Sequence, residues 1–250
     1  MLSLVLCLTV GACAAAPPAV MPPPAFVGTQ LDRPIARSVL DLPLTTSDGR
    51  SVTLSSFHGR FVVLYDMMTL GRETSPVNTA AIVQAARAVQ TAGLGDRVRF
   101  VGVTVDPRRD TPTRLAAYRH LYFDPPADWT LVTGSADGLA TLWDHFGVYR
   151  ERVPQDTDRA ADWMTLRPLT YTVAHNDEVH FLDRREHDRF VLAGPAHVQR
   201  SAAVPALLDT FLDGQGRRDL TEPALNSWTA RQVLNVLGRL TARRIPLDAH

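Results

Sequence analysis

A predicted strand, loop and helix between residues 61 and 93 constrain the fold of this chain more than any other feature. Phe61–Tyr65 is a short apolar run of β-prone residues, which predicts a buried strand. Ser75-Pro76 predicts the start of a helix, because a hydroxyl suits the N-cap and proline suits the first helical position, where no N–H is needed. The helix is expected to end near Gly93. The chain therefore contains a buried strand that a loop joins to the N-terminus of a helix.

Strand and helix patterns alternate along most of the chain. Ser47-Asp48-Gly49 predicts a tight turn within an N-terminal hairpin, whose strands are expected at residues 39–44 and 51–54. Further strands are predicted at residues 98–105, 129–133, 169–174, 179–182 and 190–192, helices at 111–122, 135–146 and 202–212, and an exposed loop at 151–166. This order predicts an α/β fold with a mixed central sheet and helices on both of its faces.

The last part of the chain, residues 214–250, is predicted to be a helical extension. Within residues 228–243, apolar side chains recur at the spacing of one helix face, namely Ala230, Val233, Leu234, Leu237 and Leu240. We expect this amphipathic helix to pack against its own domain. A helix that binds a partner or a membrane surface is the alternative.

The first residues of the chain are typical of an export signal. Met1–Ala12 is short and apolar, and the small residues before Cys13 resemble the lipidation site of a bacterial lipoprotein. We therefore expect residues 1–13 to be a signal and Cys13 to carry a lipid, which would anchor the exported protein to a membrane, in the periplasm or on the outer face. An ordinary signal peptide is the alternative. Residues 14–34 are rich in Pro and Ala, which predicts a tether before a folded domain at residues 35–213.

Cysteine and lysine usage excludes several kinds of chemistry. The only cysteines are Cys7 and Cys13, so the expected folded domain has no thiol for a structural disulfide or for redox catalysis. All 26 basic residues are arginine, which excludes lysine-based Schiff-base chemistry. They balance 26 acidic residues, so no strong charge favours nucleic acid as a partner. The sequence also lacks glycine-rich phosphate loops, a nucleophile elbow and zinc-type ligand spacing.

Two further segments make a resemblance to a known family visible. After the strand, loop and helix comes VRFVGVTVDPRRDTPTRLAAY at residues 98–118, and TSDGRSVTLSSFHGR at residues 46–60 precedes them. Together they resemble the Sco/SenC family, over roughly Val39 to Leu212. The resemblance implies a thioredoxin-like fold and a membrane-tethered protein that helps to deliver copper to a respiratory oxidase.

The resemblance also locates the family's copper ligands on this chain. The loop of the family carries Cys-x-x-x-Cys-Pro, and without gaps its cysteines fall on Gly71 and Ser75, followed by Pro76. The family's distant histidine ligand falls on His175. Because Cu(I) prefers sulfur ligands, the loss of both thiolates predicts that copper binding is weak or lost. Gly71 is then interpreted as a flexible loop residue and Ser75 as the helix cap.

Three functions follow from these features. We favour a non-redox assembly or binding factor for a copper-containing respiratory oxidase, with an oxidase subunit or another assembly factor as its partner and no enzymatic activity. The alternative is an atypical Cu(I) carrier that uses Met67, Met68 and His175, since thioethers also bind Cu(I). A thioredoxin-fold redox enzyme is disfavoured because the expected mature domain has no attacking thiol.

Overall fold

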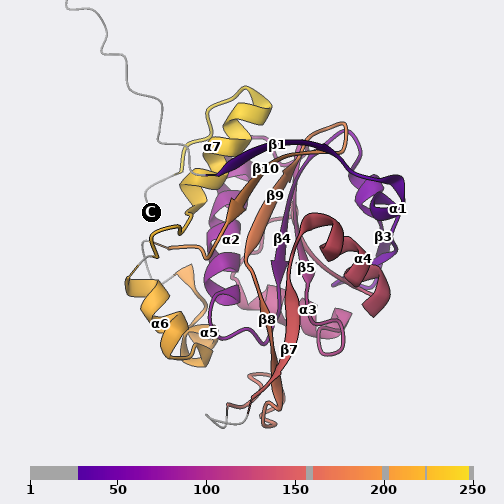
Figure 1. The fold of residues 1–250 in the computed structure, drawn as a ribbon. Helices are drawn as coiled ribbons and strands as arrows, with labels where there is room; N and C mark the ends of the chain where they lie inside the picture. Colours follow the sequence, from indigo (N-terminus) through magenta and orange to yellow (C-terminus); the bar gives the residue numbers. More distant parts are fainter. Residues whose placement is uncertain (1–27, 156–159, 199–202, 223, 248–250) are drawn as a thin grey trace, which may run out of the picture.

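The structure, a computed structural model, describes residues 28–155, 160–198, 203–222 and 224–247. These residues form a mixed sheet in the order β1-β10-β9-β4-β5-β6-β2-β3, a second pair β7-β8, and flanking helices (Figure 1). The strands are β1 (Thr29–Pro34), β2 (Leu44–Thr46), β3 (Ser51–Val52), β4 (Phe61–Met67), β5 (Val98–Thr104), β6 (Trp129–Gly134), β7 (Arg150–Pro154), β8 (Tyr171–His175), β9 (Glu178–Leu182) and β10 (His187–Ala193). The helices are α1 (Arg37–Leu40), α2 (Ser75–Thr91), α3 (Pro112–Leu121), α4 (Ala136–Phe146), α5 (Ala206–Phe211), α6 (Gly214–Thr221) and α7 (Ala230–Thr241), and Leu54–Phe57 forms a 3-10 turn.

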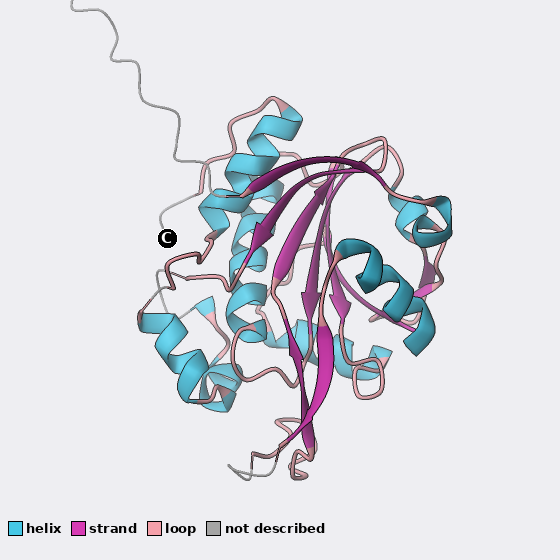
Figure 2. Cartoon of the chain, viewed as in Figure 1, coloured by secondary structure: helices cyan, strands magenta, loops and turns pink. Residues whose placement is uncertain are grey.

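Strand β4 lies at the centre of the sheet. It pairs in parallel with β5 and antiparallel with β9, so both of its edges are hydrogen-bonded. Every residue of β4 is buried, because helices cover both faces of the sheet (Figure 2). Alternate side chains enter two cores, with Phe61, Val63, Tyr65 and Met67 on the side of α2, and Val62 and Leu64 on the side of α4. The predicted α/β fold with a mixed sheet and helices on both faces is confirmed.

The N-terminal hairpin is confirmed, but its first strand was predicted too long. Strand β2 starts at Leu44, and residues 37–40 form α1 instead of a strand. Val39 and Leu40 are buried in the core beneath α4, and a helical turn lets both of them reach it.

Residues 151–166 are not entirely the exposed loop that was predicted. Residues 150–154 form β7, which pairs antiparallel with β8. Four of the five β7 residues are exposed, so the strand carries no alternation of apolar and polar residues by which the sequence could reveal it. Residues 150–154 form a strand because they pair with β8, and not because of a pattern in their own sequence.

The expected tether is partly folded. Thr29–Pro34 forms β1, which pairs antiparallel with β10 at the edge of the sheet, so the folded part begins before residue 35. The predicted signal, Cys13 and residues 14–27 lie outside the described residues. Of the helices in the described part of the chain, none has both the length and the apolar character that crossing a membrane requires.

The C-terminal residues pack against the rest of the domain, as expected. Val233, Leu234 and Leu237 on α7 are buried in the same core as Ile82 and Val89 on α2. Helix α5 is shorter than the predicted helix 202–212, and α6 was not predicted. Asp213 caps α6, since its Oδ1 accepts hydrogen bonds from the N–H groups of Gln215 and Gly216 at 2.9 Å.

Candidate functional site

A pocket of about 170 Å³ opens beside the loop between β4 and α2. Its wall includes Gly71, Ser75 and His175, which the family resemblance singled out, and Met68, which belongs to the alternative Cu(I) site. Residues of the loop and of β8 therefore meet at one place, although about 100 positions separate them in the sequence. This arrangement is consistent with the expectation that the family's ligand positions lie close together.

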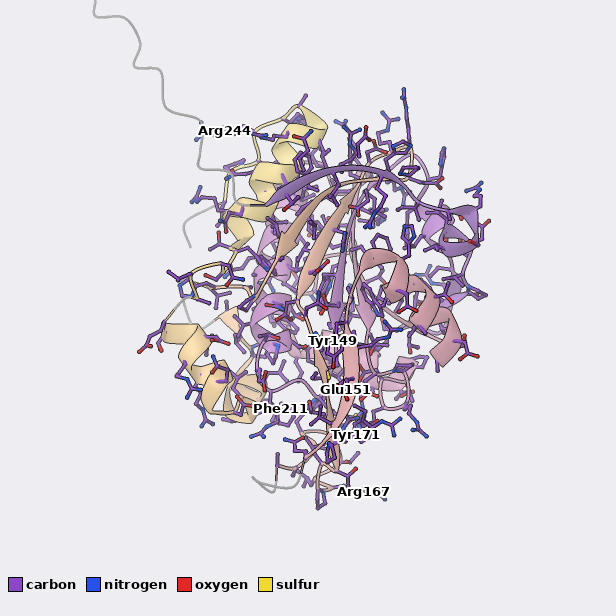
Figure 3. All side chains as sticks on the ribbon, viewed as in Figure 1. Tyr149, Glu151, Arg167, Tyr171, Phe211 and Arg244 are labelled. Atoms are coloured by element: carbon purple, nitrogen blue, oxygen red, sulfur yellow. The ribbon has the colours of Figure 1, made fainter. Side chains whose placement is uncertain are left out.

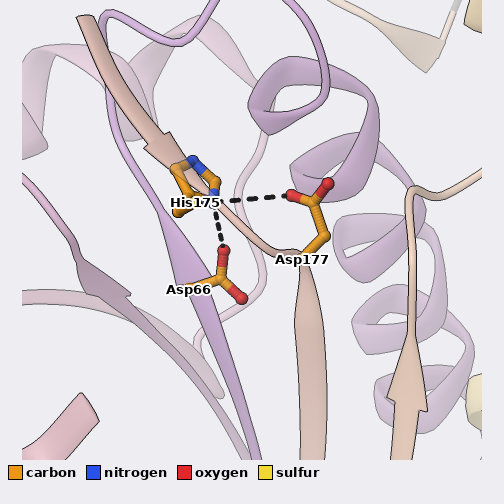
Figure 4. A group of neighbouring side chains, drawn as sticks. All are labelled: Asp66, His175 and Asp177. Atoms are coloured by element: carbon orange, nitrogen blue, oxygen red, sulfur yellow. Dashed lines mark ion pairs between the residues drawn. The ribbon is translucent and has the colours of Figure 1, made fainter. Parts of the chain in front are cut away.

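His175, the last residue of β8, lies beside two carboxylates in this pocket (Figure 4). Its Nδ1 is 3.0 Å from Oδ2 of Asp66, on β4, and 3.8 Å from Oδ1 of Asp177. The side chains of His175 and Asp66 are 4% and 1% exposed, so the ion pair between them is shielded from water. One histidine nitrogen and two carboxylate oxygens thus lie within 4.8 Å of one another.

Hydrogen bonds hold both carboxylates in place. Oδ1 of Asp177 accepts a hydrogen bond from Thr74 Oγ1 at 2.9 Å and another from Asn78 Nδ2 at 2.8 Å, both from the start of α2. Oδ1 of Asp66 accepts a hydrogen bond from the N–H of Glu178 at 2.7 Å. Oδ2 of Asp66 is buried and has no hydrogen bond of good geometry from the described residues. It lies 3.0 Å from Nδ1 of His175.

The pKa values of these groups show how burial and charge compete. Burial lowers the pKa of His175, but the contact with Asp66 and the charge of Asp177 outweigh it and raise the pKa to about 9. Burial, and then the neighbouring Asp66, raise the pKa of Asp177. Burial and Asp213 also raise the pKa of Glu73, on the same wall. Near neutral pH, His175 is therefore a cation that its carboxylates hold in place.

Ser75 does not cap the helix as predicted. Helix α2 begins at Ser75 itself, and Thr74, at the N-cap position, makes no side-chain capping hydrogen bond. The hydroxyl of Ser75 turns back and accepts a hydrogen bond from the N–H of Met68 at 3.3 Å, while the hydroxyl of Thr74 is used by Asp177. Both hydroxyls therefore bond to residues of the pocket region and not to N–H groups at the start of α2.

Gly71 lies directly against Ser75. A Cβ atom added at Gly71 would be 2.7 Å from Ser75 Oγ and 2.8 Å from Ser75 Cβ, closer than real Cβ contacts allow. Positions 71 and 75 are therefore neighbours in space, as two metal ligands must be. Glycine at position 71 permits this close approach, and a larger residue there requires the loop to move, so the interpretation of Gly71 as a flexible loop residue is incomplete.

The two methionines lie on opposite sides of the sheet. Met67 is fully buried in the core next to α2 and does not line the pocket. Met68 is buried in the other core and does line the pocket, together with His175. The set of Met67, Met68 and His175 is therefore not gathered around one point.

The C-terminal residues form a further wall of the site. The N–H of Asp213 donates to the carbonyl of Arg72 at 3.0 Å, and Arg72 Nε donates to the carbonyl of Phe211, which is labelled in Figure 3, at 3.1 Å. A Cβ added at Gly216 would lie 2.4 Å from the carbonyl oxygen of Arg72, so α6 packs tightly on the loop. Sequence reasoning missed this contact, and nothing in the sequence of residues 203–222 signals it.

Asp66 and Asp177 were also missed. A charged residue within the apolar run FVVLYDMM was a usable signal, because an aspartate in a buried strand needs a partner. Asp177 lies only two positions after His175, which was a weaker signal. Their common partner became visible only in three dimensions.

Comparisons with known proteins identify the family. The SCO1/SenC family model matches residues 36–197, more than half of the chain. The chain is 26% identical over 113 residues to Protein SCO1 homolog 2, mitochondrial, of Arabidopsis thaliana, covering 45% of this chain and 40% of that protein. It is 29% identical over 119 residues to Protein SCO2 homolog, mitochondrial, of Bos taurus, covering 48% and 44%. The chain thus spans less than half the length of these relatives.

A solved structure supports the same fold. The structure of Bradyrhizobium japonicum ScoI with copper bound matches with a TM-score of 0.50 and 24% identity, and covers 68% of this chain and 97% of that one. The fold and the strand–loop–helix site define a protein of the thioredoxin-like class. Because the family model covers most of its folded part, this chain belongs to the SCO1/SenC family.

The donor atoms of the pocket do not suit Cu(I). The described residues contain no cysteine, and the cluster beside the loop offers two carboxylates and one imidazole. Carboxylate oxygens are hard ligands, whereas Cu(I) is a soft ion that prefers thiolates and thioethers. The thioether of Met68 is the one soft donor on the described wall of the pocket.

Proposed function

We propose that this protein is a non-redox assembly or binding factor for a copper-containing respiratory oxidase. A solved Sco structure holds copper, and another is described as a member of the Sco family of cytochrome c oxidase assembly proteins, which supports this class of partner. The observation that carries the proposal is the pocket itself. It keeps the loop, the helix start and His175 of a metal-delivery scaffold, but glycine and serine stand where the family's thiolates are expected, and the donors beside the loop are two carboxylates and one imidazole.

The proposed partner is an oxidase subunit or another assembly factor. With no thiol in the described residues, the domain has no group for thiol–disulfide exchange or for peroxide reduction. The protein would therefore act by binding, either to the apo-oxidase or to a factor that carries the copper. The sequence before residue 28 supports export and attachment to a membrane through a lipid on Cys13.

A competition titration tests the loss of copper affinity. The full chain with Cys7→Ser and Cys13→Ser is titrated anaerobically with Cu(I) against a chelator of known affinity, so that no leader thiol contributes. We expect the chelator to retain the copper. Retention of Cu(I) by the protein at chelator concentrations that strip methionine–histidine sites would contradict the proposal.

Binding to the oxidase is tested in the native context. Affinity purification of the full chain from membranes is expected to recover an oxidase subunit or an assembly factor, and deletion of the gene is expected to lower oxidase activity. Cys13→Ser is expected to release the protein from the membrane fraction. Normal oxidase activity after deletion would contradict the assigned role, whereas an unchanged membrane fraction would contradict only the anchor.

A weak Cu(I) carrier is the second candidate, and the contact of Met68 and His175 with one pocket favours it. Met68→Leu would then lower the Cu(I) affinity. Met67→Leu is the matched control, since Met67 lies in the opposite core. Equal affinity in the parent protein and in Met68→Leu would exclude this candidate.

A further inference from the structure

We propose that Asp66, His175 and Asp177 form a binding site for a divalent cation of borderline hardness, for which Zn²⁺ is the probe. The site uses the pocket of the proposed function but does not depend on the oxidase as a partner. It would replace a soft cuprous site by a harder one at the same place in the fold.

The separations of the three ligand atoms fit direct coordination. His175 Nδ1 lies 3.0 Å from Asp66 Oδ2 and 3.8 Å from Asp177 Oδ1, and all three atoms lie within 4.8 Å of one another. Zinc bonds of about 2.0–2.2 Å place neighbouring ligand atoms roughly 3–3.6 Å apart. An ion between the three atoms would therefore require only small movements, the largest by Asp177.

The contact between Asp66 and His175 is one that a metal ion can take over. Oδ2 of Asp66 is shielded from water, and it lies 3.0 Å from Nδ1 of His175 without a hydrogen bond of good geometry from the described residues. Zn²⁺ binding would release the proton from Nδ1 to solvent, because a metal-bound imidazole must be neutral at the ligating nitrogen. Nδ1 and Oδ2 would then both coordinate the ion.

The surrounding hydrogen bonds orient the ligands as metal sites require. Thr74 and Asn78 donate to Oδ1 of Asp177, and the N–H of Glu178 donates to Oδ1 of Asp66. Such outer contacts fix ligating carboxylates and lower the entropy lost on binding. The ligands and their hydrogen-bond donors thus come from β4, β8, β9 and the start of α2.

The donor set and the pocket define the kind of ion. Two carboxylates and one imidazole suit Zn²⁺ and similar divalent transition ions, and they suit Cu(I) poorly. Two negative charges also compensate a divalent cation. The adjoining pocket leaves room for water or a partner's side chain in the remaining coordination positions, as in zinc sites with three protein ligands.

Zinc titration of the metal-free full chain tests the proposal. The parent protein carries Cys7→Ser and Cys13→Ser, and binding is followed by calorimetry and by competition with a chelator. The ligand variants are His175→Gln and Asp177→Asn. The matched controls are His180→Gln, which changes another buried histidine, and Asp144→Asn, which changes a carboxylate outside the pocket wall.

We expect the parent protein to bind one Zn²⁺, and each ligand variant to bind at least about tenfold more weakly, while the controls stay within about threefold. The visible spectrum of the Co²⁺ form should change in the ligand variants alone. Absence of zinc binding by the parent, or equal losses in the ligand variants and in the controls, would overturn the site. Neither of these results bears on the oxidase role, whereas tight Cu(I) binding by the parent would contradict the proposed function.

Discussion

Two buried histidines five positions apart meet carboxylates in two different ways. His175 contacts Asp66 and Asp177 through Nδ1 alone, and none of the described residues hydrogen-bonds to its Nε2. His180, on β9, uses both ring nitrogens, with Asp188 3.0 Å from Nδ1 and Glu178 3.0 Å from Nε2. Their side chains are similarly buried, at 4% and 2% exposure. The difference therefore lies in the bonding.

Charge balance separates the two clusters further. Arg33 Nη2 lies 2.8 Å from Asp188 Oδ2, so that Arg33 and His180 can balance the charges of Asp188 and Glu178. The cluster around His175 has two carboxylates for one imidazole, and it opens on a pocket. His180, with both ring nitrogens bonded and its carboxylates balanced by Arg33, has a structural role, whereas the excess negative charge around His175 lies beside a pocket that can admit a cation.

Restoring the thiols should produce the largest effect. Gly71→Cys with Ser75→Cys, in the background lacking Cys7 and Cys13, is expected to raise Cu(I) affinity by more than about a thousandfold, because two thiolates join His175. The loop must open by roughly 1 Å to separate the two Cβ atoms as far as a cysteine pair requires. Anaerobic chelator competition measures the gain, and Ser75→Cys alone is the control. An unchanged affinity would show that the loop cannot present both ligands to His175.

The cluster around His180 should contribute more to stability than the cluster around His175. Asp188→Ala is expected to destabilise the protein by about 3–5 kcal/mol, since it leaves Arg33 and His180 without their buried partner. Asp177→Ala should cost only about 1–2 kcal/mol, because it removes two hydrogen bonds and also relieves repulsion with Asp66. Urea denaturation measures both values. A larger loss of stability in Asp177→Ala than in Asp188→Ala would mean that the cluster around His175 has the structural role.

Zinc should stabilise the protein only through the cluster of Asp66, His175 and Asp177. At a free Zn²⁺ concentration of 100 times Kd, mass action predicts about 2.7 kcal/mol of added stability. The rise in Tm is expected to persist in His180→Gln and to disappear in His175→Gln. A rise that survives in His175→Gln would place the bound zinc elsewhere.

The smallest effect concerns the pH dependence of stability. Burial lowers the pKa of His180, but its hydrogen bonds to Asp188 and Glu178 outweigh burial and raise it. The charged form of His180 therefore contributes stability below the unfolded pKa of about 6.5, and this contribution is lost as pH rises through the higher folded pKa. His180→Gln is expected to reduce the decline of the unfolding free energy above pH 6.5. Urea denaturation at several pH values measures the slope, and an identical slope in both proteins would show that His180 is neutral in the fold.

The sequence predicted the central part of the fold well, because local patterns specify it. The apolar run of β4 and the proline near the start of α2 are signals within a few residues, as are the capping residues Ser135 and Gly147 at the ends of α4. Strands β1 and β7 escaped prediction because they are largely exposed and depend on distant partners. The hydroxyl of Ser75 was assigned to the helix cap, since the chain does not reveal that Met68 would compete for it.

The sequence alone determined that the expected domain has no thiol, and that it nevertheless keeps the strand, loop and helix of a metal-delivery scaffold. Tertiary structure alone decided which carboxylates lie beside His175. Asp66 and His175 are 109 positions apart, and they meet because β4 and β8 end at the same edge of the fold. Their burial there keeps water away from the ion pair, and exclusion of water is what makes a short contact between charges strong.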